Sequence, residues 1–365
     1  MRVLHFYKTY LPENFTGIPR VIHTLATTLA PAGVESEVLA LSPRPAPAPL
    51  LIDGHRVHQA RQDLFVASTG LSLSVIPAFR RLARAADILH YHFPWPVADA
   101  LHLAFGRGKP AVVTYHSDIV RQKRLARLHA PLMHRFLERV DAIIATSPDY
   151  AATSPVLARH RDRVEVIPIG LPPRTPPEAG RVARWRAELG AGFMLFVGAA
   201  RYYKGLEFLR AAAALTPVPI VLVGEGDPGP LPANMRHLGP VSDADREALL
   251  ELSAGLVLPS HLRAEAFGIV LAEAARAGRA MISCAIGTGT SFVNRDGETG
   301  FVVPPADPAA LAEAMARLAG DPALAARMGA AARRRFEAHF TAEAMGAAHL
   351  ALYRRLASSM SARIS

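Results

Sequence analysis

The chain has 365 residues, of which 50% are hydrophobic and 20% charged, so it is long and apolar enough for two globular cores and is not a largely disordered protein. Its formal charge of +10 indicates anionic partners such as phosphorylated ligands or an anionic lipid surface, and we exclude nucleic acid because no nucleic-acid-binding motif accompanies the charge. The single cysteine, Cys284, excludes an internal disulfide, and we expect it to be a small buried residue after a strand.

The first domain is predicted to span 1–170, and it alternates short apolar runs with amphipathic helical patterns. The predicted strands are 2–6, 37–41, 87–91, 111–115, 142–146 and 164–167, and the predicted helices include 19–30 and 74–86. Strands that are apolar on both faces and separated by helices are typical of a parallel, Rossmann-like sheet. The opening strand does not resemble a signal peptide and no stretch is apolar enough to cross a bilayer, so we expect a cytoplasmic protein.

Glycine and histidine residues near strand ends are the first candidates for ligand contact. Gly17 lies in the loop after the first strand, where glycine permits close approach of a phosphate or sugar, although a plain turn would also use it. His116 follows the strand 111–115, a position where a lone histidine is more often a hydrogen-bonded core residue. His90 and His92 are expected to point to opposite faces of their strand, so we predict that the protein has no metal site.

A basic helix is predicted at 121–139, with arginine and lysine side chains between apolar residues at helical spacing. The apolar positions are Leu125, Leu128, Leu132 and Phe136. The pattern fits an ordinary surface helix with a solvated basic face, and it also fits peripheral contact with an anionic membrane, which here would be the inner face of the plasma membrane.

A proline-rich linker, 171–177, separates this domain from a second one at 178–344. The pattern restarts there, with predicted strands 193–197, 220–223, 256–259 and 280–284 and predicted helices 205–214, 266–277 and 308–318. A last helix, 345–365, is placed to cross back to the first domain. The expected fold class is therefore α/β, with two Rossmann-like parallel-sheet domains facing each other across a cleft that suits an elongated, diphosphate-containing ligand.

Two acidic residues in the second domain lie eight positions apart. Glu265 follows the strand 256–259, and Ala266, Phe267 and Gly268 open the predicted helix that carries Glu273. The free N–H groups of a helix N-terminus suit an anion. Both acids are expected to face one ligand from this one helix, although a helix-capping acid and a solvated acid would show the same spacing.

These and other motifs resemble the family 4 retaining glycosyltransferases, which have the GT-B fold. The RAEAFGIVLAE stretch at 263–273 is similar to the family's paired-glutamate signature, and FVGAARYYKGL at 196–206 to its first donor-domain strand and loop. Further similar stretches are VGEG at 223–226, GTGTS at 287–291, TGFVVPP at 299–305 and TYHSDIVRQK at 114–123. The resemblance spans nearly the whole chain.

The resemblance implies a role for each matching position. It implies that His116 contacts the donor sugar near the reacting carbon, that Glu265 binds donor-sugar hydroxyls, and that Glu273 binds the ribose hydroxyls. Arg201 and Lys204 are implied to stabilise the diphosphate leaving group. The other implied donor contacts are Gly17, Glu225, Ala266, Phe267, Gly268 and Thr288.

The sequence departs from the family pattern at two positions. Ala199 stands where the family has an arginine directly after the strand-end glycine, and Thr16 replaces one of two adjacent glycines. Lys204 is therefore a better diphosphate ligand than Arg201, and the assignment of Gly17 is weakened.

The sequences of the 114–123 and 287–291 motifs are most similar to those of bacterial mannosyl- and rhamnosyltransferases of surface-polysaccharide assembly. That similarity implies a GDP-linked donor, GDP-mannose or GDP-rhamnose, and a growing, lipid-linked acceptor. It also implies front-face displacement with retention of configuration and no bound metal or other cofactor. Two alternatives remain open: a non-transferring relative such as a sugar-nucleotide epimerase or a phosphorylase, and a non-catalytic scaffold that binds nucleotide sugars.

Overall fold

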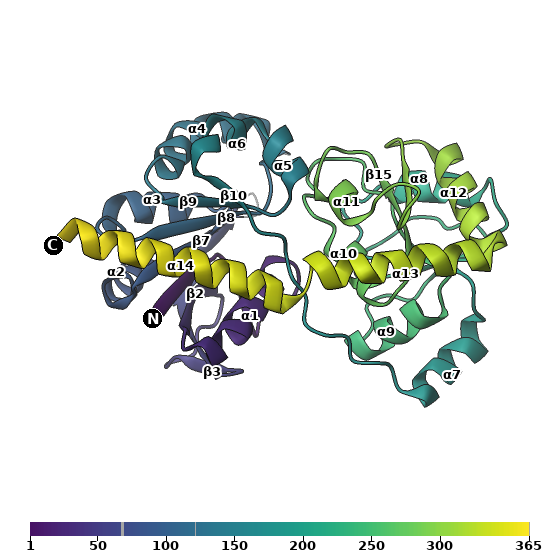
Figure 1. Ribbon diagram of the computed structural model, residues 1–365, viewed down its shortest axis with the longest axis horizontal. Helices are drawn as coiled ribbons and strands as arrows, with labels where there is room; N and C mark the ends of the chain where they lie inside the picture. Colours follow the sequence, from purple (N-terminus) through teal and green to yellow (C-terminus); the bar gives the residue numbers. More distant parts are fainter. Residues whose placement is uncertain (67–68, 121, 365) are drawn as a thin grey trace. The chain divides into compact units, whose positions relative to one another are not determined.

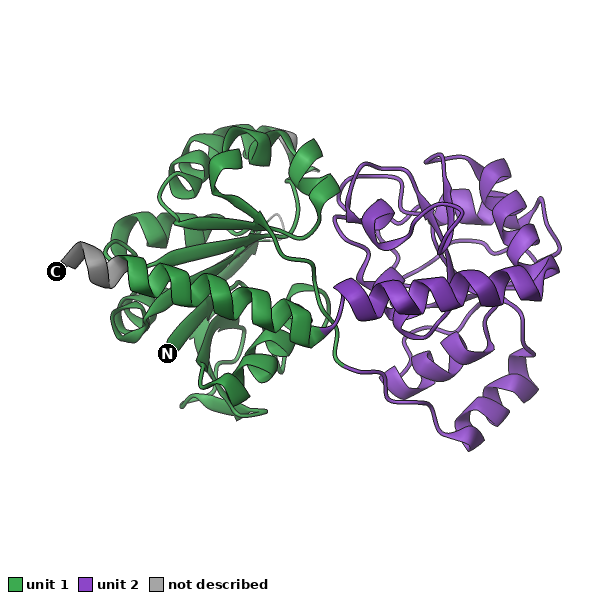
Figure 2. Ribbon diagram, in the orientation of Figure 1, with its two compact units in different colours: residues 1–172, 342–365 green, residues 173–341 purple. Residues whose placement is uncertain are grey.

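The computed structural model describes residues 1–66, 69–120 and 122–364, and the chain forms two compact units (Figures 1 and 2). Unit 1 comprises Met1–Pro172 together with Ala342–Ser365, and unit 2 comprises Pro173–Thr341. The division after Pro172 falls within the proline-rich segment, where helices and central strands cannot continue. The chain returns to unit 1 at residue 342.

Unit 1 is built on an eight-stranded sheet in the order β10-β9-β8-β7-β1-β2-β4-β3. Its strands are β1 (Arg2–Phe6), β2 (Glu35–Ser42), β3 (Leu50–Ile52), β4 (His55–Arg61), β7 (Ile88–Phe93), β8 (Ala111–Tyr115), β9 (Ala142–Ala145) and β10 (Val164–Val166). All neighbouring strands are parallel except β3 and β4. β5 (Leu64–Val66) and β6 (Thr69–Leu71) form a separate antiparallel pair.

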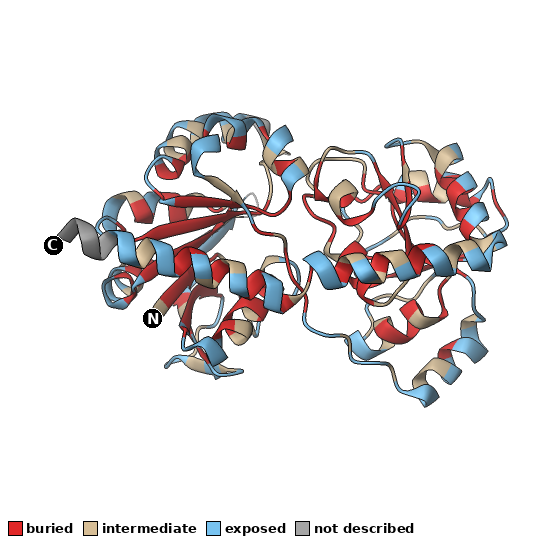
Figure 3. Cartoon of the chain, in the orientation of Figure 1, coloured by how far each residue is buried: buried red, intermediate tan, exposed pale blue. Residues whose placement is uncertain are grey.

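Helices cover this sheet. They are α1 (Ile18–Leu29), α2 (Val75–Ala85), α3 (Pro96–Phe105), α4 (Lys123–Leu137), α5 (Pro148–Thr153), α6 (Pro155–Arg159) and α14 (Ala342–Ile364), with short 3₁₀ turns at Ala30–Ala32 and Arg161–Arg163. Every residue of β7, β8 and β9 is buried, as Figure 3 shows for the middle of the sheet. Burial on both faces explains why these strands are mostly apolar.

The C-terminal helix α14 packs against α1 within unit 1 (Figure 1). Gly346 permits the close approach, because a Cβ at this position would lie 2.7 Å from Thr28 Cγ2. Further along α14, Tyr353 is buried and its hydroxyl lies 2.6 Å from His90 Nδ1 on β7. The returning helix is therefore part of the core of unit 1.

Unit 2 is built on a six-stranded parallel sheet in the order β13-β12-β11-β14-β15-β16. Its strands are β11 (Met194–Val197), β12 (Ile220–Val223), β13 (Met235–His237), β14 (Gly255–Leu258), β15 (Ala280–Cys284) and β16 (Gly300–Val303). Its helices are α7 (Ala179–Leu189), α8 (Leu206–Ala213), α9 (Asp243–Leu252), α10 (Ile269–Arg276), α11 (Gly289–Val293), α12 (Pro308–Gly320) and α13 (Pro322–His339). The strand order reverses between β11 and β14, and open α/β sheets bind ligands at such a switch point.

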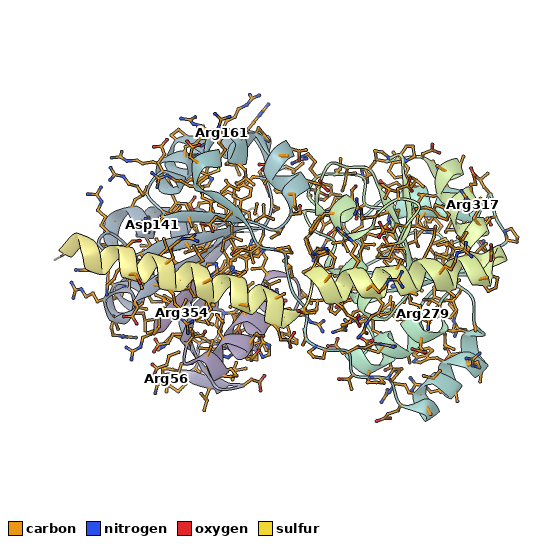
Figure 4. The ribbon with its side chains drawn as sticks, in the orientation of Figure 1. Arg56, Asp141, Arg161, Arg279, Arg317 and Arg354 are labelled. Carbon is orange, nitrogen blue, oxygen red and sulfur yellow. The ribbon has the colours of Figure 1, made fainter. Side chains whose placement is uncertain are left out.

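Many charged side chains lie on the surface of unit 1. Arg56 and Arg161 of unit 1 lie at its periphery (Figure 4), and their side chains are 66% and 86% exposed. No helix in the described part of the chain combines the length and the apolar character that a membrane-spanning segment needs.

Candidate functional site

The loops that follow β11 and β14 meet at the switch point of unit 2. Gly205 ends the first loop with φ of +69°, and a Cβ there would lie 2.1 Å from the carbonyl oxygen of Pro259 in the second. The backbone N–H of His261 donates to the carbonyl of Tyr203 at 3.1 Å. Only glycine tolerates both the left-handed conformation and this contact, so Gly205 fixes how closely the loops approach.

This approach brings Lys204 and Glu265 together. Lys204 Nζ lies 2.5 Å from Glu265 Oε2, and the two side chains are only 11% and 12% exposed. Ser260 Oγ donates to the same carboxylate oxygen at 3.2 Å. Burial alone would lower the pKa of Lys204, but the attraction of the Glu265 carboxylate outweighs it and raises the pKa, so Lys204 is a permanent cation at neutral pH.

The loop that carries Glu265 is hydrogen-bonded to the segment between β15 and α11. Thr288 is fully buried, and its hydroxyl donates to the carbonyl of Glu265 at 2.8 Å. The N–H of Gly289 donates to the carbonyl of Ala266, and Arg263 Nη1 donates to the carbonyl of Gly287, each at 2.8 Å. Thr288 therefore fixes the backbone that carries Glu265.

The helix expected to start at Ala266 begins at Ile269 instead. Gly268 caps it in the left-handed conformation, with φ of +78°, which interrupts the helical path just before α10. Ala266 and Phe267 thus lie in the loop, and both are buried. The N–H of Leu271 donates to the carbonyl of Gly268 at 2.8 Å, so the N–H groups of Ile269 and Val270 are the ones at this end of α10 that suit an anion.

The two acids do not project from one helix as the sequence suggested. Glu265 lies in the loop before α10, while Glu273 lies within α10 and is only 4% exposed. Arg246 of α9 lies 3.4 Å from the Glu273 carboxylate. Because α10 begins only after Gly268, Glu265 lies in a loop and pairs with Lys204, whereas Glu273 lies in the helix and pairs with Arg246.

The remaining unit 2 candidates lie on the loops after β11 and β12. Arg201 and Glu225 are both exposed, and the N–H of Ala200 donates to the carbonyl of Glu225 at 2.8 Å. Gly224 makes this possible, because a Cβ there would lie 2.1 Å from the carbonyl oxygen of Gly198. The exposed guanidinium of Arg201 thus lies on the loop after β11, which is hydrogen-bonded to the loop after β12.

The unit 1 candidates lie at the start of α1 and at the end of β8. Gly17 caps α1 with φ of +60° and has open space around it, so its conformation requires glycine whether or not a ligand approaches. His116 follows β8 and is 7% exposed. Burial, followed by repulsion from His349, lowers the pKa of His116 to about 3, so its ring is neutral at pH 7.

His90 and His92 point to the same face of β7, and the prediction of opposite faces was wrong. Residues two apart in a strand share a face. Their rings stack with centroids 4.4 Å apart, and His5 of β1 joins them so that one ring nitrogen from each lies within 4.8 Å of the others. The sequence analysis missed this cluster; the spacing of His90 and His92 in a buried strand was enough to place these two rings on one face, but the position of His5 depends on the β1–β7 register.

Cys284 at the end of β15 is buried, as expected. Burial raises the pKa of its thiol to about 12, so it is protonated at neutral pH and unsuited to act as a nucleophile.

Comparisons with known proteins identify the family. The models for Glycosyltransferase Family 4 and for Glycosyl transferases group 1 match residues 15–175 and 183–335. The D-rhamnosyltransferase WbpZ of Pseudomonas aeruginosa is 50% identical over 94% of this chain and 93% of its own length. The chain belongs to glycosyltransferase family 4. The O-antigen chain mannosyltransferase C of Escherichia coli is 45% identical over 99% of this chain and 100% of its own length.

The fold of this glycosyltransferase is confirmed by solved structures. A sucrose-phosphate synthase from Thermosynechococcus elongatus superposes with a TM-score of 0.81 over 98% of this chain and 99% of that one, at 22% identity. The predicted GT-B class, with two Rossmann-like parallel-sheet units, is therefore correct.

Proposed function

We propose that this glycosyltransferase transfers mannose or rhamnose from a GDP-linked donor to a growing, lipid-linked oligosaccharide or polysaccharide. The observation that carries the proposal is the buried Lys204–Glu265 pair at the switch point of unit 2. It occurs in a chain that is 45% and 50% identical to relatives named as a mannosyltransferase and a rhamnosyltransferase. The same names, one of which refers to O-antigen, support a role in surface-polysaccharide synthesis.

The leaving group sets what the donor site must do. Negative charge builds on the diphosphate as the glycosidic bond breaks, and fixed cations and N–H donors stabilise it. Lys204, Arg201 and the first N–H groups of α10 would supply these interactions. Glu265 would accept hydrogen bonds from donor-sugar hydroxyls, and Glu273, oriented by Arg246, would bind the ribose hydroxyls.

The reaction is proposed to proceed with retention and without a covalent intermediate. The leaving diphosphate and the incoming acceptor hydroxyl would lie on the same face of the sugar. The bond from the anomeric carbon to the diphosphate oxygen would break as the bond to the acceptor oxygen forms, and the proton of the acceptor hydroxyl would pass to the leaving diphosphate. His116 would contact the sugar as a neutral imidazole. We propose that no metal is needed, because Lys204 supplies a permanent positive charge for the diphosphate.

Peripheral membrane contact is proposed for α4. Leu125 and Leu128 are 53% and 80% exposed, and each directly follows an exposed arginine, Arg124 and Arg127. Phe136, the last apolar residue of the predicted stripe, is instead buried in unit 1. Arg121 lies outside the described residues. Exposed leucines among arginines are typical of helices that rest on anionic lipid, where a lipid-linked acceptor would also be found.

A donor panel followed by turnover tests the function. We expect GDP, GDP-mannose or GDP-rhamnose to raise the thermal unfolding midpoint more than UDP-, dTDP- or ADP-sugars. With a lipid extract that contains the acceptor, mass spectrometry should show one added sugar for each GDP released. An epimerase would change the donor without adding mass to the acceptor, and a scaffold would bind the donor without releasing GDP.

Metal removal gives an independent prediction. Treatment with excess EDTA should leave kcat within about twofold of the untreated value, because the diphosphate charge is met by side chains and N–H groups. Loss of activity on chelation and its recovery with added Mg²⁺ or Mn²⁺ would contradict the proposed metal independence.

A further inference from the structure

Unit 1 contains a line of hydrogen-bonded imidazoles that ends at His116. His5 Nδ1 lies 3.3 Å from His92 Nε2, and His92 Nδ1 lies 3.0 Å from His116 Nε2. The three side chains come from β1, β7 and the end of β8, and none of the three residues is more than 7% exposed. Neighbouring rings in the line are stacked, with interplanar angles of 28° and 23°.

The protons in this line are not independent. Burial is the main cause that lowers the pKa of all three histidines, to about 3 for His5 and His116, so each ring is neutral at pH 7. A neutral imidazole has one N–H donor and one acceptor nitrogen. The two hydrogen bonds among the three rings can therefore run in only two directions. Either every ring carries its proton on Nδ1 and donation runs from His5 to His116, or every ring carries it on Nε2 and donation runs from His116 to His5.

The far end of the line selects between them. His5 Nε2 is buried and has no hydrogen-bond partner among the described residues. Buried N–H groups without an acceptor are rare in native structures, so this nitrogen is the bare acceptor and the proton of His5 is on Nδ1. His5 then donates to His92, and His92 donates to His116 Nε2. His116 is left with its proton on Nδ1, the nitrogen that His92 does not engage.

We propose that His5 and His92 are positioning residues that hold His116 as the Nδ1–H tautomer, which rests on the role given to His116 in the proposed function. In this state His116 offers the donor sugar a hydrogen-bond donor of fixed direction. Neither positioning residue needs to touch substrate.

A metal site in the same cluster is the competing interpretation. His5, His90 and His92 could each offer one nitrogen to an ion. However, His90 Nδ1 lies 2.6 Å from Tyr353 Oη and its Nε2 lies 2.7 Å from Thr114 Oγ1, and both nitrogens of His92 are engaged in the line. An ion would have to break these hydrogen bonds, so the observed arrangement favours the imidazole line.

Nitrogen-15 NMR of histidine-labelled wild-type protein at pH 7 tests the assignment without any substitution. We expect the two ring nitrogens of His5, His92 and His116 to show the shifts of the Nδ1–H tautomer. An Nε2–H shift pattern for His116 would overturn the proposal. Stoichiometric bound metal, with metal-shifted His5 and His92 signals, would overturn it in favour of the competing site.

Substitutions then test the coupling. In His5→Leu, His92 loses its donor, and we expect His116 to become a mixture of tautomers although it is two rings away. We expect kcat to fall about 10- to 100-fold with the KM for the sugar nucleotide unchanged. His5→Asn, whose amide nitrogen can replace Nδ1, should restore both the tautomer and kcat.

His349→Leu is the matched control. It removes a buried imidazole of the same cluster whose Nδ1 bonds to the carbonyl of Met345 rather than to the line. An unchanged His116 tautomer in His5→Leu, or an equal loss of kcat in His349→Leu, would overturn the proposal. If the wild type turned over neither GDP-mannose nor GDP-rhamnose, the proposed function would fail, but the NMR shifts would still decide the tautomer.

Discussion

Lys204 and Glu265 form an ion pair in which the two side chains are only 11% and 12% exposed. Removing one partner of a buried ion pair typically costs about 3–5 kcal/mol, because the remaining charge stays buried without compensation. A bound sugar nucleotide changes this balance, since its diphosphate can pair with Lys204 and its hydroxyls with Glu265. The ion pair therefore holds both side chains in place at the site proposed for the donor.

Lys204→Met should weaken donor binding. It removes the cation proposed to face the diphosphate, and we expect the Kd for GDP to rise at least about tenfold, the weakening that loss of a charge-assisted hydrogen bond of about 1.5–3 kcal/mol produces. Calorimetric titration with GDP measures this. Arg161→Met, which removes an 86% exposed cation in unit 1, is the control and should bind GDP normally. Equal affinity in Lys204→Met and the wild type would remove Lys204 from the site.

Gly205→Ala should damage the site through the backbone alone. The added Cβ would lie 2.1 Å from the Pro259 carbonyl oxygen at a φ of +69°, so the two loops must separate. We expect GDP affinity and thermal stability both to fall. Gly239→Ala, which has a similar φ of +72° but open space around it, is the matched control for the backbone conformation. A Gly205→Ala protein no worse than this control would show that the loop contact is unimportant.

Among the elements, the fully buried parallel strands are the ones that the sequence predicts well. β9 is apolar along its whole length, and β7 and β8 are mostly apolar, with His90, His92 and Thr114 as polar exceptions, because every residue of the three strands is buried. The strands that were not predicted include β3, β4, β13, β16 and the β5–β6 pair. β4 has polar residues at five of its seven positions, HRVHQAR, so it lacks the continuous apolar run used to find the others. β5 is apolar, LFV, but only three residues long, and all three are exposed, so burial does not explain its pattern.

The prediction for α4 concerns its exposed half. Leu125→Glu with Leu128→Glu places charge where membrane contact is proposed, and we expect binding to vesicles that contain anionic lipid to fall at least about tenfold in a sedimentation assay. Activity on a soluble acceptor analogue should be unchanged. Leu51→Glu, at a position that is 74% exposed in β3, serves as the control. Vesicle binding that survives the double substitution would exclude α4 as the contact.

At the scale of the whole molecule, buried neutral histidines are concentrated in unit 1. The pKa is lowered mainly by burial to about 3 for His5 and His116, and to about 4 for His55, His102 and His349. In unit 2 His339 has a lowered pKa, again mainly through burial. Acid should therefore affect the two units unequally.

Unit 1 should lose stability between pH 6.5 and about pH 4. Above 6.5 these histidines are neutral whether the chain is folded or unfolded, so their contribution is fully present. Below 6.5 the unfolded chain binds protons that the folded unit cannot, and each histidine costs about 1.4 kcal/mol per pH unit until its folded pKa is reached. Hydrogen exchange followed by mass spectrometry should show unit 1 opening first as the pH falls. Equal protection of both units down to pH 4.5 would contradict this.

The two-unit architecture and the positions of Lys204, Glu265 and His116 at strand ends could be predicted from the sequence because they depend on local pattern. The contacts that give these residues their chemistry could not. The Lys204–Glu265 pair depends on the close approach of two loops at Gly205 and Pro259. The imidazole line joins residues of β1, β7 and the end of β8. Such pairings depend on sheet register, which a single sequence does not specify.

The central claim is that Glu265, paired with Lys204, acts on a GDP-linked sugar. Its most direct measurement is kcat for sugar transfer to the lipid-extract acceptor at saturating donor, compared between the wild type, Glu265→Gln and the exposed control Glu313→Gln. We expect transfer by the wild type and by Glu313→Gln, with a loss of at least about 100-fold in Glu265→Gln, a typical effect of removing a group that acts at the reacting centre. Full activity in Glu265→Gln would contradict it.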